Sequence, residues 1–233
     1  MANVSENLAE AKTLDQLEEL RDRPGFFKQL STFARKQPLG FAGGMVVLVF
    51  IILAVFAPLL SPFDPEASSY EHMLAPPGTA SEQGTFILGT DDFGRDVLTR
   101  IIYGAQTALF VGFTCAIIGS VVGLVLGVGS AFFGGKVDLI FQRIMDIFMA
   151  FPLIIMALSI VAIFGSSIQN VIIAITIPFI PRCARVVRSS ALAIREIPYI
   201  DAARANGFSN SRIILRHMVP NVMAPFLIML TAF

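Results

Sequence analysis

The stretch LGFAGGMVVLVFIILAVFAPLLS, residues 39–61, carries no charged side chain and is made almost entirely of apolar residues. It lies in a run of 27 uncharged residues between Lys36 and Asp64. A helix that crosses a bilayer needs about 20 predominantly apolar residues. The stretch therefore predicts a membrane-spanning helix, which we place at residues 39–60.

A cleaved signal peptide is the alternative for an apolar run this close to the amino terminus. The 38 residues before this run include six basic and six acidic side chains. A signal peptide instead starts with a short, positively charged segment directly before its apolar core. The layout therefore favours a retained spanning helix.

The composition of the whole chain also indicates a membrane protein. Of the 233 residues, 55% are hydrophobic and 15% are charged, and the mean hydropathy is +0.74. These values are too apolar for a domain that must cover itself with polar surface. Basic and acidic residues number 17 each, so the net charge indicates neither a nucleic acid nor an acidic partner. Cys115 and Cys183 lie far apart in apolar surroundings, which is typical of small hydrophobic residues rather than of a disulfide or metal pair.

A second long apolar region covers residues 101–135, which are uncharged, and we place a span at residues 105–132. It contains Gly119, Gly123 and Gly127, whose spacing of four puts them on one face of a helix. Because glycine has no side chain, such a face lets the backbone of another helix approach closely. We therefore interpret these glycines as helix-packing positions.

The remaining apolar regions predict three more segments. Residues 147–181 are uncharged but contain the turn-forming sequence FGSSIQN, so we expect one span at 144–164 and another at 168–188. A fifth run, 222–233, is too short to cross a bilayer, and we expect a truncated sequence that shows five of six spans. The fold class is accordingly all-α integral membrane. Kinks or loosened turns are predicted at three prolines: Pro152, Pro178 and Pro181.

The distribution of basic residues predicts the orientation of the chain. Six Lys or Arg residues precede the first span, residues 62–104 hold two against seven acids, and residues 182–216 hold seven. Cytoplasmic segments carry the excess of Lys and Arg. We therefore expect a cytoplasmic amino terminus and an external loop after the first span.

The sequence DAARANGFSNSRIILRHMVP, residues 201–220, interrupts the apolar chain with a polar segment. Pro198 suits the first turn of a helix, and Gly207 is suited to end that helix in the left-handed conformation. Ser209 can cap a second helix that ends as Pro220 leads into the fifth apolar run. One side of this second helix is apolar and another is basic: Ile213, Ile214 and Met218 against Arg212 and Arg216. From the residues alone, an interfacial helix resting on anionic lipid is an equal alternative to a segment that transmits movement.

This segment resembles the EAA loop of permease subunits in bacterial ATP-binding-cassette importers, which runs Glu-Ala-Ala, glycine and a terminal Leu-Pro. In that family the loop forms a coupling helix that fits a groove on the ATPase subunit. Asp201 stands where Glu is usual, and Val219 stands where Leu is usual. The resemblance assigns the coupling role to eight residues: Asp201, Ala202, Ala203, Gly207 and Pro220, with Arg212, Arg216 and His217 beside them.

The sequence LGTDDFGRDVLTRIIYGAQTAL, residues 88–109, narrows the resemblance to the C-type permease subunit of dipeptide, oligopeptide and nickel importers, from about Phe27 onward. The family motif is carried by Gly89, Asp91, Asp92, Gly94, Arg95 and Asp96. These residues predict a tight turn followed by a helix from about Arg95. The three acids are an alternative cation site. Because they lack regular ligand spacing and Arg95 lies among them, a salt-bridged turn is favoured. The tripeptide DFG also matches a kinase motif, but no glycine-rich loop or catalytic loop accompanies it.

The resemblance implies a type I importer transmembrane domain in the bacterial cytoplasmic (inner) membrane, which forms half of a translocation path for peptides. It implies no catalytic residue, metal or cofactor in this chain, with ATP and Mg²⁺ bound by partner ATPase subunits. The chain contains no GxxxxGK[ST] phosphate-binding loop. The implied partners are a second homologous permease, two ATPase subunits, a periplasmic or lipid-anchored substrate-binding protein and membrane lipids, without nucleic acid.

Other functions stay open as alternatives. Nickel or glutathione are alternative cargoes for the same class of importer. A secondary transporter would place ionisable residues in the middle of its spans, and the spans drawn above have none there. A signalling or scaffold protein would need a soluble domain, and no segment outside the spans is large enough to form one.

The expected organisation has three parts. Residues 1–25 form a cytoplasmic extension with a helix capped at Thr13 and Gln16. Residues 26–104 comprise an amino-terminal elbow, the first span and the periplasmic loop. Residues 105–233 form the permease core, with the coupling loop at 189–221.

Overall fold

The computed structural model describes residues 25–232, which divide into two compact units between Ile102 and Tyr103. The expected amino-terminal extension, with its Thr13 and Gln16 cap, lies outside the described residues except for Gly25.

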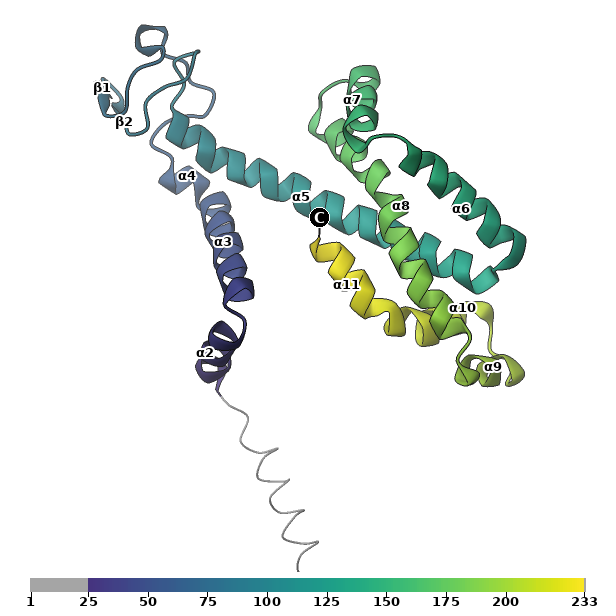
Figure 1. Ribbon diagram of the computed structural model, residues 1–233. Coiled ribbons are helices and arrows are strands. Elements are labelled where there is room, and N and C mark those ends of the chain that lie inside the picture. Colours follow the sequence, from purple (N-terminus) through teal and green to yellow (C-terminus); the bar gives the residue numbers. More distant parts are fainter. Residues whose placement is uncertain (1–24, 233) are drawn as a thin grey trace, which may run out of the picture. The chain divides into compact units, whose positions relative to one another are not determined.

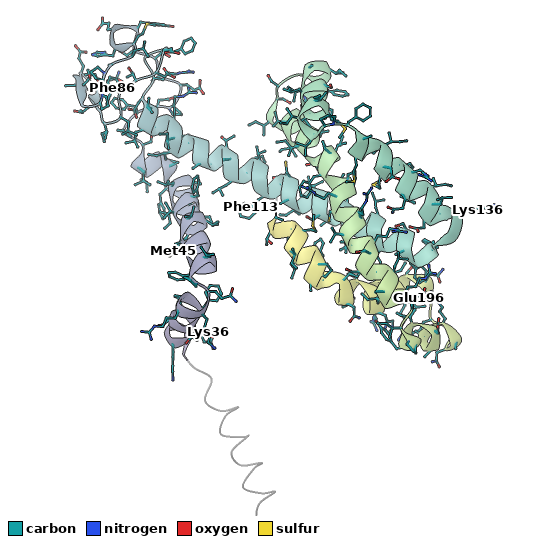
Figure 2. The ribbon with its side chains drawn as sticks, in the orientation of Figure 1. Lys36, Met45, Phe86, Phe113, Lys136 and Glu196 are labelled. Atoms are coloured by element: carbon teal, nitrogen blue, oxygen red, sulfur yellow. The ribbon has the colours of Figure 1, made fainter. Side chains whose placement is uncertain are left out.

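The first unit begins with three helices, α2 (Phe26–Lys36), α3 (Pro38–Val55) and α4 (Ala57–Leu60) (Figure 1). α3 is apolar on all sides, and Ala54 is its one buried residue. Phe41 and Leu53 are half-buried, and the other residues of α3 are exposed, Met45 among them (Figure 2). A helix that is apolar all round and not covered by protein suits a lipid environment.

A compact loop follows these helices and leads into α5. It contains the 3₁₀ turn η1 (Tyr70–His72) and an antiparallel pair of strands, β1 (Thr79–Ser81) and β2 (Gly84–Phe86). The sequence pattern did not predict this hairpin, because each strand has three residues and shows no clear alternation. The end of α4 is tied to the start of α5, since the Ser61 hydroxyl donates to Thr99 Oγ1 over 3.1 Å.

The second unit is a bundle of helices in which α8 is central. α11 and α6 pack against α8, and α7 folds onto its first half (Figure 1). The helical elements are α5 (Val97–Phe133, which begins in the first unit), α6 (Gly135–Ala150), α7 (Leu153–Phe164), α8 (Ile168–Arg195), α9 (Pro198–Ala205), α10 (Asn210–Ile213), the π turn η2 (Ile214–Met218), the 3₁₀ turn η3 (Val219–Val222) and α11 (Met223–Thr231).

Four helical stretches of the described chain are long and apolar enough to cross a membrane: α3, α5, α8 and residues 210–231. The pair formed by α6 and α7 passes the same test together, with a bend of 86° between its halves. The predicted helical membrane architecture is confirmed, with four to five candidate spans.

The predicted start of the span at 144–164 is wrong, whereas the kink predicted at Pro152 is present as the 86° bend between α6 and α7. α6 begins at Gly135 and ends at Ala150, and α7 starts a new helix in a different direction. Proline disfavours helical backbone in the residue before it, and Phe151 is accordingly extended (φ −85°, ψ 134°) ahead of Pro152. α8, in contrast, continues through Pro178 and Pro181 without a break.

The predicted helix end at Pro220 is also wrong. Residues 210–231 form one helical stretch, which widens to a π turn before Pro220 and tightens to a 3₁₀ turn around it. Proline lacks the N–H that an α-helix would use, so the change in hydrogen-bond spacing lets the helical path continue. The second helix of the polar segment and the fifth apolar run are therefore joined.

The bundle depends on a close approach of α5 to α8. A Cβ atom on Gly123 would lie 2.7 Å from Cys183 Cβ, and one on Gly127 would lie 2.6 Å from the carbonyl oxygen of Ala184. Gly119 is buried on the same helix. The glycine face of α5 therefore lies directly against the backbone of α8.

Gly127→Ala is expected to destabilise the chain by about 1–3 kcal/mol, because the added methyl group meets backbone atoms that cannot rotate away. Thermal unfolding of the full chain in lipid nanodiscs, followed by circular dichroism, measures this. Gly112→Ala is the matched control on the same helix, since no atom lies within 4 Å of its Cβ position. Equal melting temperatures for the two variants would contradict the close approach.

Candidate functional site

The polar segment after α8 forms two short helices joined at a glycine corner. Gly207 has φ +74°, its N–H donates to the carbonyl of Arg204 (2.9 Å), and the N–H of Phe208 donates to the carbonyl of Ala203 (3.1 Å). This pair of bonds is the Schellman arrangement that ends a helix. The hydroxyl of Ser209 then caps α10 by accepting the N–H of its third residue over 3.4 Å. We call α9, the corner and residues 210–218 the elbow.

The inner face of the elbow is part of the core of the bundle. Ile200, Ile213 and Met218 are fully buried, and Ala203 is 5% exposed. They share one core cluster with residues of α5 and α8, namely Val128, Ala131, Phe132, Cys183, Val187 and Ala191. The elbow is therefore packed into the same core as α5 and α8.

The outer face of the elbow is polar and open. Of the eight residues assigned to coupling, six are exposed, His217 is half-buried and Ala203 faces the core; the exposed six are Asp201, Ala202, Gly207, Arg212, Arg216 and Pro220. Asp201 pairs with Arg204 over 3.0 Å. The guanidinium of Arg212 lies 4.0 Å from the ring centre of Phe208, whereas Arg216 forms no ion pair with the described residues.

A cluster of side chains around His217 fixes the end of the elbow. The carbonyl of His217 accepts hydrogen bonds from Asn221 Nδ2 (2.6 Å) and from the Tyr199 hydroxyl (3.2 Å). The imidazole stacks on the ring of Phe208 with 6.0 Å between centroids. Sequence reasoning missed Tyr199 and Asn221. Pro220 was the available signal. It has no backbone N–H, so a carbonyl in the preceding turn needs a side-chain donor instead.

Arg195 joins the C-terminal ends of α5 and α8. Its guanidinium donates to the carbonyl of Ala131 over 2.8 Å, in the last turn of α5, where a positive charge is favourable to the helix dipole. Gly134, with φ +62°, leaves the space that this guanidinium occupies. The turn from α5 to α6 and the start of the elbow are therefore fixed to each other.

Two ion pairs connect α6 to α8. Arg188 binds Asp138 with two bonds of 2.5 Å, and Arg185 binds Asp146 over 2.7 Å. The first pair is partly buried, and its bidentate geometry is the stronger one. The spans predicted at 144–164 and 168–188 contain Asp146, Arg185 and Arg188, but the sequence did not predict that these residues form ion pairs.

Residues 88–96, which carry the family motif, form a salt-bridged turn in the first unit. Asp91 Oδ1 accepts the N–H groups of Phe93 (2.9 Å) and Arg95 (3.0 Å), and its Oδ2 binds the Arg95 guanidinium over 2.8 Å. Gly94 and Gly89 have positive φ angles, +71° and +80°. A Cβ on Gly94 would overlap the carbonyl of Ser69, and one on Gly89 that of Ala75. Both glycines therefore let the turn pack onto the preceding segment.

The three acids of this motif have three different environments. Asp91 holds the turn, Asp92 is exposed, and Asp96 is buried as the residue that caps α5. Among the described residues, no group of three His, Cys, Asp or Glu side chains is arranged to hold a metal ion. The three carboxylates are therefore separate groups of one folded turn.

The charge state of Asp91 links this turn to pH. Desolvation in the loop raises its pKa, but hydrogen bonds from Arg95 and Phe93 and the charge of Arg95 outweigh this and lower the pKa from 3.8 to about 2. A carboxyl group whose pKa falls on folding stabilises the folded state above its unfolded pKa. That contribution is lost as the pH falls through the folded value.

Asp91→Asn is therefore expected to remove the acid sensitivity of the turn between pH 3.8 and about 2. Pulsed hydrogen exchange of residues 88–96 at a series of pH values measures it. Asp92→Asn, an adjacent change of equal charge, is expected to keep the parent profile. If both variants follow the parent, Asp91 does not stabilise the turn.

Two protein families match segments of this chain. Residues 119–232 match the family described as binding-protein-dependent transport system inner membrane component. Residues 33–77 match the N-terminal TM domain of oligopeptide transport permease C. The first match contains the elbow and most of the bundle, and the second contains α3.

Three similar proteins cover most of the chain. A Brucella suis protein provisionally named a peptide transport system permease is 44% identical over 192 residues, which are 82% of this chain and 63% of that protein. A glutathione transport system permease of Pectobacterium atrosepticum is 34% identical, covering 83% and 63%. A dipeptide transport system permease of Haemophilus influenzae is 30% identical, covering 86% and 72%. The chain thus spans about 63% of the length of the first two relatives.

Proposed function

This chain belongs to the family of binding-protein-dependent transport system inner membrane components, as a C-type permease of the ATP-binding-cassette importers, and we propose that it forms half of a path for peptides. A second permease completes the path across the bacterial cytoplasmic membrane. Two ATPase subunits bind ATP and Mg²⁺, and one of them docks on the elbow of this chain. A substrate-binding protein delivers the peptide from outside. The amino terminus and the elbow lie in the cytoplasm, and residues 62–96 lie outside.

One observation carries this proposal: the elbow has a buried inner face and an open, polar outer face. Ile200 and Ile213 connect it to the core of the bundle, while Arg216 has no ion-pair partner among the described residues. A helix that only rested on lipid would need no such connection to α5 and α8. The elbow can therefore pass a movement from a docked subunit to the membrane helices.

The mechanism follows from this connection. ATP binding draws the two ATPase subunits together, and each subunit moves the elbow that it holds. The elbow is packed against α8 and tied by Arg195 to the end of α5. ATP thus supplies the differential affinity that shifts the helices from an inward-open to an outward-open arrangement.

The names of the relatives support peptides as the substrate class. Because one relative is named for glutathione transport, uptake assays should compare a dipeptide, an oligopeptide and glutathione.

Gly207→Val is expected to uncouple ATP hydrolysis from uptake in the reconstituted importer. A β-branched residue at φ +74° is strained by about 1–2 kcal/mol or more, although the Cβ position itself is open. Asn tolerates left-handed backbone, so Gly207→Asn is the matched control and should retain coupling. The measurement is the ratio of peptide transported to ATP hydrolysed in proteoliposomes. An unchanged ratio in the Val variant would argue against the coupling role.

Arg216→Gln is expected to weaken retention of the ATPase subunits on the purified permease severalfold in detergent, where no anionic bilayer exists. Arg216 is a cleaner probe than Arg212, which also contacts the ring of Phe208. Lys28→Gln removes the same charge from α2 and should leave retention unchanged. If Arg216→Gln changes only the affinity for anionic vesicles, the elbow is a lipid-binding segment instead.

A further inference from the structure

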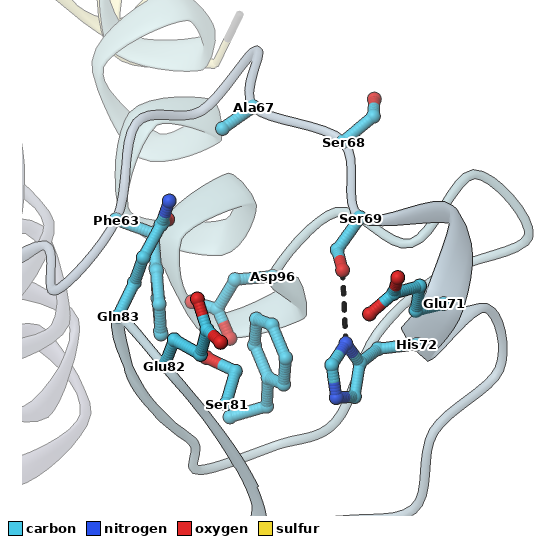
Figure 3. Close-up of a pocket in the computed structure, with 11 residues that line it drawn as sticks. Phe63, Ala67, Ser68, Ser69, Glu71, His72, Ser81, Glu82, Gln83 and Asp96 are labelled. Carbon is cyan, nitrogen blue, oxygen red and sulfur yellow. Dashed lines mark hydrogen bonds between the residues drawn. The ribbon is translucent and has the colours of Figure 1, made fainter.

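The external loop contains a hollow of about 220 Å³ that is partly open to solvent. Segments before the hairpin, the hairpin itself and the start of α5 surround it (Figure 3). Its chemically distinctive lining residues are two phenylalanines, one histidine and three acids: Phe63, Phe86, His72, Glu71, Glu82 and Asp96. Nothing in the proposed transport mechanism uses this hollow.

Asp96 forms the back of the hollow and is 3% exposed. One carboxylate oxygen, Oδ2, accepts the N–H of Thr99 over 2.7 Å and so caps α5. The other oxygen, Oδ1, has no hydrogen-bond partner among the described residues. Figure 3 shows Asp96 among the side chains that line the hollow. A buried carboxylate oxygen without a donor is costly, so the site is suited to receive a hydrogen-bond donor.

The charge around the hollow is also uncompensated. Residues 62–104 contain seven acids and two arginines, and both arginines are engaged by Asp91, over 2.8 Å and 3.7 Å. No Lys or Arg side chain lines the hollow. The acids that line it therefore create a negative potential, which attracts a cation.

The walls of the hollow select the kind of cation. The rings of Phe63 and Phe86 stack with 4.8 Å between centroids, and His72 lies 5.6 Å from Phe86. Aromatic faces attract an ammonium or guanidinium group and also pack against an aliphatic stem. A divalent metal instead prefers several oxygen ligands at one point, and no such group exists among the described residues. The combination fits a lysine or arginine side chain.

We propose that this hollow receives a basic side chain of the external substrate-binding protein. The proposal rests on the proposed function, since it requires a binding protein that docks on this chain from outside. The buried Asp96 oxygen accepts from the ammonium or guanidinium group, Glu71 and Glu82 compensate its charge at the rim, and the half-buried ring of Phe63 packs against its stem. Docking through this contact fixes the position of the binding protein on the external loop.

The chemistry of the hollow is tested on the full chain in lipid nanodiscs by calorimetric titration with Nα-acetyl-lysine methylamide. Saturable binding is expected, at least tenfold weaker in Glu82→Gln and in Asp96→Asn, which keeps the helix cap. Glu66→Gln, an exposed acid in the same loop that does not line the hollow, is the matched control and should bind as the parent does. The norleucine analogue, which lacks the ammonium group, should not bind. No saturable binding, or equal binding by all variants, overturns the proposal, and so does displacement by MgCl₂ at constant ionic strength.

The source of the cation is tested with the assembled importer and its binding protein. Glu82→Gln should raise the Kd for the binding protein about tenfold. Substituting one lysine or arginine of that protein should raise the Kd by the same factor, and combining the two substitutions should raise it no further. An unchanged Kd overturns the proposal. Binding of dialanine amide that is tighter than that of Nα-acetyl-lysine methylamide overturns it too, because the hollow would then be a subsite for the substrate amine. If the parent importer moves no peptide while the lysine derivative still binds, the proposed function fails and the chemistry of the hollow stands.

Discussion

The close approach of α5 to α8 at Gly123 and Gly127 is the constraint on which the second unit depends. In a membrane, apolar side chains gain little by leaving lipid for another helix, so association depends on dense packing and on small residues that let backbones meet. Here the glycine face of α5 lies against the backbone of α8 around Cys183 and Ala184. The same two helices supply the core that buries the inner face of the elbow. A wider separation would leave that face without its partners.

Polar contacts then fix the orientation that packing alone would leave free. Arg195 joins α8 to the end of α5, and the pair formed by Asp138 and Arg188 joins α8 to α6. These contacts are directional, whereas apolar packing is not. In the proposed importer, a displacement of the elbow therefore has a defined route into three membrane helices. The bend at Pro152 gives α7 a different direction from α6, and both helices pack against α8.

Much of this architecture could be predicted from single residues and local patterns. Uncharged runs predicted the apolar helices, because the bilayer requires them wherever the chain crosses. The φ of Gly207 and the cap at Ser209 could be predicted because both depend only on neighbouring residues. The start of α6 could not, since Asp138 and Asp146 lie outside the uncharged run 147–181 on which that prediction rested. Their partners lie 50 and 39 residues away on α8, which local reasoning does not reveal. Pro220 was expected to end a helix, but a π turn allowed the helix to continue.

The charged residues fall into two classes, and the difference bears on how the chain meets its partners. Charges that hold the chain's own elements together are paired: Asp91 with Arg95, and Asp138 with Arg188. Among the described residues, charges without an ion-pair partner include Arg212 and Arg216 at the elbow and Glu71 and Glu82 around the hollow. An exposed charge without an ion-pair partner contributes little to the stability of its own chain, but it attracts a partner of opposite charge. Because the two places have opposite sign, a partner complementary to one is repelled by the other. In the proposed importer this discriminates between the ATPase subunits and the binding protein before any close contact forms, in addition to the barrier that the membrane itself provides.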